Sequence, residues 1–165
     1  MKILVLSDSH AALSFMRRCV AAVKPNAIVH LGDYYDDAQT LQEVFPYIPL
    51  HQVPGNCDRY RCPPGALETI CYDVCGVRLF MTHGHKHGVK TNTAMLVAEA
   101  RAMKAQAALY GHTHVAEVYR DEDGMWVMNP GSAGYGGGSA GLIEAENGQI
   151  LSCRILTADD LDGNR

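Results

Sequence analysis

Short apolar runs that end abruptly in polar residues recur along the chain. Such runs predict strands buried on both faces of a sheet, because each position along them faces packed neighbours. Apolar residues at helical spacing separate some of the runs and predict helices over 12–23, 37–45 and 91–104. A strand, a helix and a strand in that order favour a parallel pair with a right-handed crossover. The five buried strands are predicted over Ile3–Leu6, Ala27–Leu31, Leu50–Val53, Val77–Thr82 and Ala107–Tyr110.

Turn sequences divide much of the rest into hairpins. Gly76, Asp121–Gly124 and Asn147-Gly148 each separate short runs with strand character. The further strands are predicted over 69–74, 115–119, 125–128, 142–145 and 149–155, with a glycine-rich loop over 133–141. A chain of 165 residues, 47% of them hydrophobic, suits one domain. We expect that domain to cover 1–158 and residues 159–165 to fray.

Composition removes several classes of protein. A net charge of −4 argues against a general nucleic-acid binder. No run approaches the ~20 apolar residues of a membrane span, and the first run is too short for a signal peptide, so we expect a cytoplasmic protein without membrane contact. No Gly-x-Gly-x-x-Gly follows the first strand, which excludes a dinucleotide fold. The six cysteines contain no Cys-x-x-Cys pair and are expected to be buried, reduced thiols, with Cys57 set apart.

Metal-binding residue types follow all five buried strands. A single such histidine would usually be structural, but the joint pattern predicts one site, since ligands bind at the carboxyl ends of strands in α/β sheets. On an extended backbone Asp8 and His10 would point to the same side. The candidate ligands are Asp8, His10, Asp33, Asn56, His83, His112 and His114.

The donor set indicates the metal and the substrate. Imidazole, carboxylate and amide oxygen without thiolate suit Mn, Fe, Zn, Co or Ni. Seven ligands are too many for one catalytic ion but fit two ions that share a carboxylate. Two divalent ions bring four positive charges and Asp8 and Asp33 remove two, so the site should attract an anion such as a phosphate ester. Paired ions can generate hydroxide near neutral pH for in-line attack on phosphorus.

The ordered motifs resemble the calcineurin-like metallophosphoesterase superfamily. They read Asp-x-His, Gly-Asp, Gly-Asn-Cys-Asp, His-Gly-His and Gly-His-Thr-His, and the cysteine after Asn56 is typical of its small single-domain phosphodiesterase branch. The resemblance implies an α/β fold, a four-layer α-β-β-α sandwich of two mixed sheets. It also implies two divalent ions, manganese first among them. One ion would be bound by Asp8, His10 and His114, and the other by Asn56, His83 and His112. Asp33 would bridge the two ions, and Asp58 would support the site without binding an ion.

One position departs from the common family pattern. Many members have histidine after the Gly-Asn pair, where it contacts the leaving group or the substrate, whereas this chain has Cys57. A thiol forms weaker hydrogen bonds than an imidazole. We therefore expect a preference for esters with good leaving groups, or another acid, for which His85 is the candidate. His87 is expected at the surface, and His30 and His51 are expected to be structural.

Two alternatives to a phosphodiesterase stay open at this point. The charge balance also permits a phosphomonoesterase. The branch is also similar to a scaffold subunit of an endosomal sorting coat, which uses this fold to bind partners. Retention of all seven ligands favours the enzyme. The expected partner is a small phosphate-ester or nucleotide-like substrate, and self-association into a homo-oligomer stays open.

Overall fold

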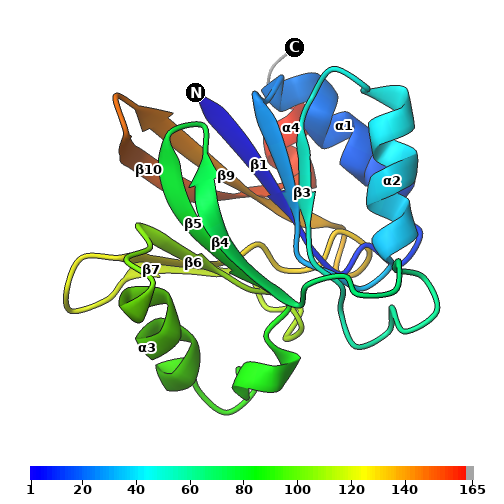
Figure 1. The fold of residues 1–165 in the computed structure, drawn as a ribbon. Helices are drawn as coiled ribbons and strands as arrows, with labels where there is room; N and C mark the ends of the chain where they lie inside the picture. Colours follow the sequence, from blue (N-terminus) through cyan, green and yellow to red (C-terminus); the bar gives the residue numbers. More distant parts are fainter. Residues whose placement is uncertain (163–165) are drawn as a thin grey trace.

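Two five-stranded sheets face each other, and each mixes parallel and antiparallel neighbours (Figure 1). This computed structural model describes residues 1–162. The first sheet has the order β10-β9-β1-β2-β3 and the second β4-β5-β6-β8-β7. The first sheet comprises β1 Lys2–Leu6, β2 Ala27–His30, β3 Leu50–Gln52, β9 Ser139–Glu146 and β10 Gln149–Thr157. The second comprises β4 Thr69–Val74, β5 Val77–Thr82, β6 Ala107–Leu109, β7 Glu117–Arg120 and β8 Trp126–Asn129.

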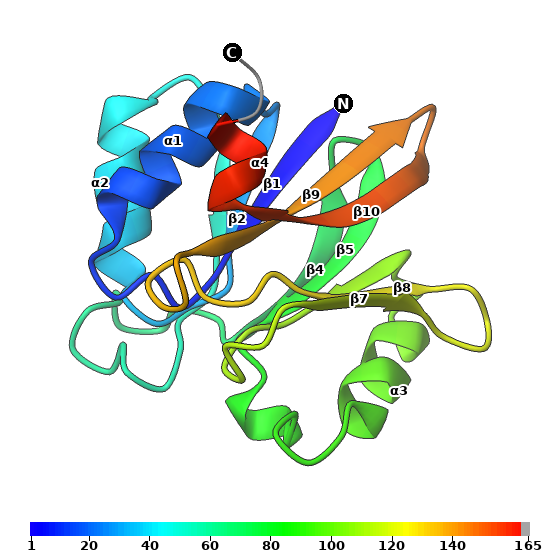
Figure 2. The ribbon, with the colours of Figure 1, turned by 180° about the vertical axis from the view of Figure 1, so that it is seen from behind.

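Helices cover the outer face of each sheet, which gives the predicted four layers. The helices α1, α2 and α4 lie over the first sheet, and α3 lies over the second (Figures 1 and 2). Their bounds are α1 Leu13–Val23, α2 Tyr35–Val44, α3 Ala94–Ala102 and α4 Ala158–Asp162, with a short 3-10 turn η1 at His85–His87. No helix within residues 1–162 is long and apolar enough to cross a bilayer.

The position of the first strand, β1, explains why its sequence is apolar throughout. Ile3 and Val5 enter the core between the two sheets, while Leu4 and Leu6 enter the core beneath α1 and α2. All four side chains are fully buried, because both faces of β1 are covered. The strand pairs in parallel with β2 and antiparallel with β9, so it lies at the centre of its sheet. The predicted parallel crossover is therefore present.

The structure differs from the sequence predictions at several element ends. The strand predicted from residue 142 begins at Ser139, inside the expected glycine-rich loop. Position 141 of this strand requires glycine, because the Met128 side chain packs directly over it and leaves no space for a side chain. Within the tail expected to fray, α4 runs to Asp162, which pairs with Arg18 at 2.8 Å. Residues 163–165 lie outside the described residues.

Candidate metal centre

The candidate ligands gather where the strand ends of the two sheets meet. Ligand atoms of Asp8, His10, Asp33 and His114 all lie within 4.8 Å of one another. Asp8 and His10 follow β1, Asp33 follows β2, and His114 follows β6 of the other sheet. Oxygen and imidazole donors at this spacing can hold a divalent ion.

The other three candidates lie on the far side of the two carboxylates. His83 Nε2 is 3.0 Å from Asn56 Oδ1, 3.6 Å from Asp33 Oδ2 and 4.0 Å from Asp8 Oδ1. The ring of His112 lies 5.1 Å from that of His83. Asp33 and Asp8 both approach the two groups of donors, and Asp33 comes closer to His83.

His83 is oriented by a backbone contact. Its Nδ1 lies 2.8 Å from the Leu31 carbonyl oxygen, which can only accept a hydrogen bond. Nδ1 therefore donates to this carbonyl, and Nε2 faces Asn56 Oδ1 and the two carboxylates. A backbone partner on the second ring nitrogen is the usual arrangement for a histidine that binds a metal.

Two buried polar atoms at the centre make no hydrogen bond of good geometry within residues 1–162, although Asp8 Oδ1 lies 3.1 Å from His114 Nε2. They are Asp8 Oδ1 and His10 Nε2. The other oxygen of Asp8 accepts hydrogen bonds from the Ser7 hydroxyl at 2.6 Å and from the His112 amide at 3.0 Å. Orphaned buried polar atoms are rare in folded proteins and indicate a ligand. A cation among these donors fits the residues present.

Five of the seven candidates have a left-handed backbone, which L-residues other than glycine seldom adopt. Their φ values are 51° for Asp8, 44° for His10, 58° for Asp33, 70° for His112 and 60° for His114. The expected extended backbone at Asp8 and His10 is wrong, because β1 ends at Leu6 and the chain turns sharply after it. Backbone strain of this kind clusters at functional sites.

Glycines of two motifs allow the loops to approach the carboxylates closely. A Cβ on Gly55 would overlap Asp33 Oδ1 and the Asp33 amide. A Cβ on Gly111 would overlap the Ser7 hydroxyl and lie 2.7 Å from Asp8 Oδ2. The glycines of the Gly-Asn and Gly-His pairs are therefore required by space at these two carboxylates.

The Asp33 carboxylate is prepared to bind a cation. Burial raises the pKa of Asp33. His83 and the Cys57 amide, which donates to Asp33 Oδ1 at 2.9 Å, lower it by more, so the pKa is below its usual value. Asp33 is therefore ionised at neutral pH. Cys57 is exposed, and partial burial together with Asp33 raises the pKa of its thiol, so the thiol stays protonated there.

Asp58 acts on the backbone of the site. Its fully buried carboxylate accepts hydrogen bonds from the amides of Asp33, Tyr34, Tyr35 and Gly55 at 2.7–2.9 Å. It thereby joins the turn after β2 to the loop after β3. Its position is that of a residue that orients Asp33 and Asn56.

His85 borders the centre. Its ring lies 5.4 Å from that of His83 and 6.1 Å from that of His112, and its buried Nδ1 has no hydrogen-bond partner. Burial and the neighbouring His83 lower its pKa. The side chain is half-buried and reaches the edge of a cavity beside Asn56.

The expectation that His87 lies at the surface is wrong. His87 is 6% exposed, its Nε2 lies 2.8 Å from Glu99 Oε2, and its ring meets the Phe80 ring edge-on. Gly84 and Gly88, at φ values of 100° and 63°, turn this segment back against α3. His30 and His51 are hydrogen-bonded, His30 to the Ser9 hydroxyl and His51 to the Tyr72 hydroxyl, as expected for structural residues.

Several contacts around the centre were not predicted from the sequence. The His10 ring lies between Tyr34 and Tyr135, with ring centroids 4.9 Å away from each. The buried Asp37 carboxylate accepts hydrogen bonds from the Ser9 hydroxyl and the Ala11 amide, which fixes the turn that carries His10. The only sequence signal for them was proximity to the motifs or to the glycine-rich loop.

Ser132 and Asn129 connect the downstream loop to the centre. The Ser132 hydroxyl donates to the Asp8 carbonyl at 2.7 Å. The Asn129 amide donates to the Gly111 carbonyl at 3.1 Å and to the Thr113 hydroxyl at 2.8 Å. The Asn-Pro-Gly-Ser sequence therefore orients the backbone beside Asp8 and beside His112.

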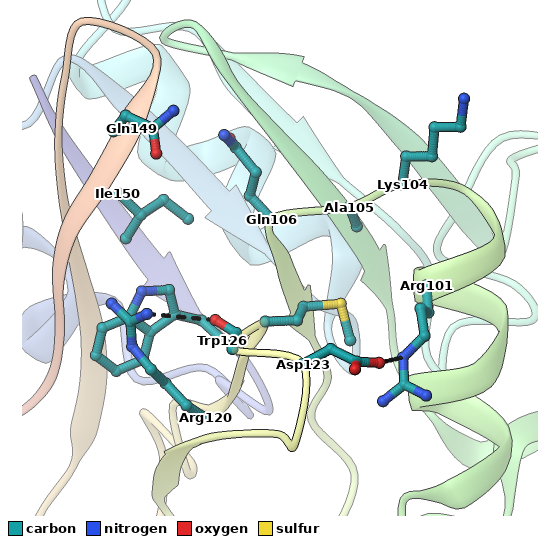
Figure 3. A pocket seen from close by; sticks show the side chains of 11 residues that line it. Arg101, Lys104, Ala105, Gln106, Arg120, Asp123, Trp126, Gln149 and Ile150 are labelled. Atoms are coloured by element: carbon teal, nitrogen blue, oxygen red, sulfur yellow. Dashed lines mark hydrogen bonds and ion pairs between the residues drawn. The ribbon is translucent and has the colours of Figure 1, made fainter.

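A separate hollow lies at the ends of β6 and β8 away from His112 (Figure 3). Three of its four charged side chains, Arg101, Arg120 and Asp123, are engaged with one another or with its walls. Arg101 Nε lies 2.8 Å from Asp123 Oδ2, and the Arg120 guanidinium lies 4.2 Å from the centre of the Trp126 ring. The hollow is lined by none of the seven candidate ligands.

Comparison with known proteins links the chain to phosphoesterases. Residues 1–148 match the calcineurin-like phosphoesterase superfamily domain. A probable metallophosphoesterase of Mycoplasma pneumoniae is 30% identical over 139 residues, which cover 79% of this chain and 78% of the relative.

Solved structures share the architecture. A predicted phosphoesterase of Streptococcus pneumoniae has a TM-score of 0.76 at 26% identity, covering 96% of this chain and 90% of its own. Vps29 of Entamoeba histolytica, solved in complex with zinc, has a TM-score of 0.68 at 19% identity, covering 95% of this chain and 99% of its own. The second likeness concerns the fold alone.

Proposed function

We propose that this chain, which belongs to the calcineurin-like phosphoesterase superfamily, hydrolyses phosphodiesters with two divalent metal ions. Family membership supports a metal-dependent phosphoester hydrolase. The preference for diesters and the use of two ions are the parts that we propose.

The observation that carries the proposal is the distribution of donors on two sides of the same carboxylates. Asp8, Asp33, His10 and His114 form one cluster, and His83 brings Asn56 within 3.0 Å on the other side. Among the described residues, His10 Nε2 is buried without a hydrogen-bond partner, and Asp8 Oδ1 lies 3.1 Å from His114 Nε2 without a hydrogen bond of good geometry. Both features support ligation by two ions that share Asp33.

Divalent ions at this position would supply Lewis acidity and a nucleophile from water near neutral pH, with manganese as the favoured ion. The residues of the chain hold and orient them. The Leu31 carbonyl fixes the ring of His83, Asp58 fixes the turn of Asp33, and Ser132 fixes the backbone of Asp8. The exposed Asn56 and Cys57 and the half-buried His85 lie where the substrate would approach.

A scaffold is the second candidate function. The Vps29 structures share this fold over most of both chains, and one of them binds zinc. Metal binding by this protein would therefore not distinguish an enzyme from a scaffold. Hydrolysis that depends on the metal ligands would distinguish them.

The test strips the protein with a chelator, titrates it with Mn²⁺, and follows cleavage of bis-p-nitrophenyl phosphate and p-nitrophenyl phosphate. We expect two ions per chain and a higher kcat/KM on the diester. Asn56→Ala and His83→Ala should abolish the activity. His51→Ala is the matched control, because His51 is hydrogen-bonded to Tyr72 away from the centre and its loss should leave the activity.

Each part of the proposal has its own contrary result. Metal binding without turnover on either ester would favour the scaffold. A higher kcat/KM on the monoester would replace the diesterase by a monoesterase. A single bound ion with full activity would exclude the dinuclear centre. A cytoplasmic location and self-association also stay predictions, for which cell fractionation and sedimentation are the measurements.

A further inference from the structure

A cavity opens directly beside the candidate metal centre. Its volume is about 550 Å³, and Asn56 and His85 form the edge that it shares with the centre. Asn56 Oδ1 lies 3.0 Å from His83 Nε2, so a group in the cavity adjoins the metal ligands. A volume of this size falls within the range of pockets that hold drug-sized ligands.

The wall of the cavity presents both apolar and polar surface. Pro54, Pro63, Pro64 and Ala66 contribute ring and methyl surface to it. Polar side chains also line it, and Glu68 among them pairs with Lys86; they are Asn56, Asp58, Arg59, Glu68 and His85. Apolar surface beside placed polar groups suits an organic ligand that itself carries both kinds of surface.

The loop that forms the wall is held in place. The amides of Arg61 and Cys62 donate to the Asp58 carbonyl at 2.8 and 3.1 Å. The Ala66 amide donates to the Pro63 carbonyl at 3.1 Å, and the two adjacent prolines restrict the backbone between them. The cavity is therefore formed before a ligand arrives, which lowers the entropic cost of binding.

We infer that this cavity binds one organic ester group of the substrate, so that the substrate is a phosphodiester carrying a bulky, partly apolar group. The inference rests on the proposed phosphodiesterase activity. It also specifies the part of the substrate that lies away from the phosphorus atom. The phosphate lies at the metal ligands, and the ester group extends past Asn56 and His85 along Ala66. A methyl ester leaves most of the cavity unfilled.

The test compares three diesters that share the p-nitrophenolate leaving group and differ only in the other ester, which is methyl, phenyl or thymidine 5′. We expect kcat/KM to rise from methyl to thymidine on the order of tenfold, because burial of a few apolar groups contributes that much. Ala66→Trp should fill the cavity and bring the ratio of the thymidine ester to the methyl ester close to one. Leu67→Trp, at a position that is 67% exposed and outside the cavity wall, should keep the ratio.

A second readout does not depend on turnover. Cys62 is a half-buried free thiol in the cavity wall. Thymidine 5′-phosphate should slow its alkylation by iodoacetamide several-fold, while methyl phosphate should not. Tryptic cleavage after Arg61 gives the peptide 62–78, which also contains Cys71 and Cys75, and fragmentation of this peptide by mass spectrometry assigns the alkylation to Cys62.

The outcomes separate this inference from the proposed function. Metal-dependent hydrolysis with equal rates on the three esters, unchanged in ratio by Ala66→Trp, would overturn the inference and leave the proposed function standing. Protection of Cys62 by thymidine 5′-phosphate without hydrolysis of any ester would support the cavity and overturn the phosphodiesterase. Equal protection by both phosphates would overturn the inference.

Discussion

The phenol ring of Tyr135 stacks on the imidazole of His114, with ring centroids 5.2 Å apart and planes inclined by 18°. The same ring lies 4.9 Å from that of His10. Tyr135 is held by its amide, which donates to the Ser132 hydroxyl at 3.1 Å, and that hydroxyl donates to the Asp8 carbonyl. The tyrosine is thus a positioning residue for two candidate metal ligands.

Replacing Tyr135 with Ala should weaken Mn²⁺ binding about two- to tenfold, since an aromatic pair contributes about 0.5–1.5 kcal/mol. The reason is that His114, which is exposed, would lose the surface that holds its ring. Affinity is measured by competition with a fluorescent chelator. Tyr135→Phe keeps the ring and should bind like the wild type; a phenylalanine variant as weak as the alanine variant would contradict the stacking role.

Asp58→Asn should destabilise the fold by about 2–5 kcal/mol. An amide side chain offers one acceptor oxygen in place of two, and each carboxylate oxygen of Asp58 accepts from two backbone amides, so two amides would face an NH₂ group in a buried site. Urea denaturation of the chelated protein measures the change.

The matched control for Asp58 is Asp36→Asn. The Asp36 carboxylate pairs with Arg61 at 2.9 Å, but both side chains are partly exposed, so the loss should stay below about 1 kcal/mol. Equal losses for the two variants would contradict the role of Asp58 as the acceptor that joins the two loops.

Much of the centre was predictable because strand ends are visible in the sequence. Ile3–Leu6 is apolar at every position since both faces of β1 are covered, and the polar residues that follow it must therefore lie at the sheet edge. Parallel pairing of β1 with β2 then brings Asp33 beside Asp8. The chemistry of the site followed from residue types and order alone.

The contacts that the sequence did not reveal depend on the turns. Asp8 and His10 converge through a left-handed backbone, which alternation along a strand does not describe. The place of Tyr135 depends on where β9 begins, and the paired Ser139 and Thr157 extend that strand into a glycine-rich segment. His87 is buried because two glycines reverse the chain around it. Local periodicity contains none of this information.

Cys57→His should raise kcat on diesters with poor leaving groups. Cys57 is exposed beside Asn56, and an imidazole there offers a stronger hydrogen bond than a thiol. A well-placed proton donor typically raises a rate about 100-fold or more. We therefore expect kcat to rise about tenfold on an alkyl ester and to change little on p-nitrophenyl esters, whose leaving group needs no proton. Cys57→Ser, which keeps a small side chain, is the control. An equal gain on both kinds of ester would contradict a leaving-group role.

His30 should make the stability of the metal-free fold depend on pH. Burial lowers its pKa to about 3, with His83 and His10 lowering it too and Asp33 opposing them. The unfolded chain takes up a proton near pH 6.5, whereas the folded chain does not until about pH 3. The contribution of His30 is therefore fully present above pH 6.5 and is lost as the pH falls, by at most about 1.4 kcal/mol per unit.

His30→Gln removes this titration and keeps a side chain that can bond the Ser9 hydroxyl, which lies 3.1 Å from His30 Nε2. The measurement is the free energy of unfolding by urea, in chelator, from pH 8 to pH 4.5 for both proteins. The difference between the two proteins at pH 8 gives the cost of altered packing. The difference between their slopes below pH 6.5 gives the proton taken up by His30 on unfolding. We expect the wild type to lose stability more steeply than the variant. Parallel curves would contradict the prediction, because they would show that the His30 imidazole takes up its proton over the same pH range in the folded and the unfolded protein.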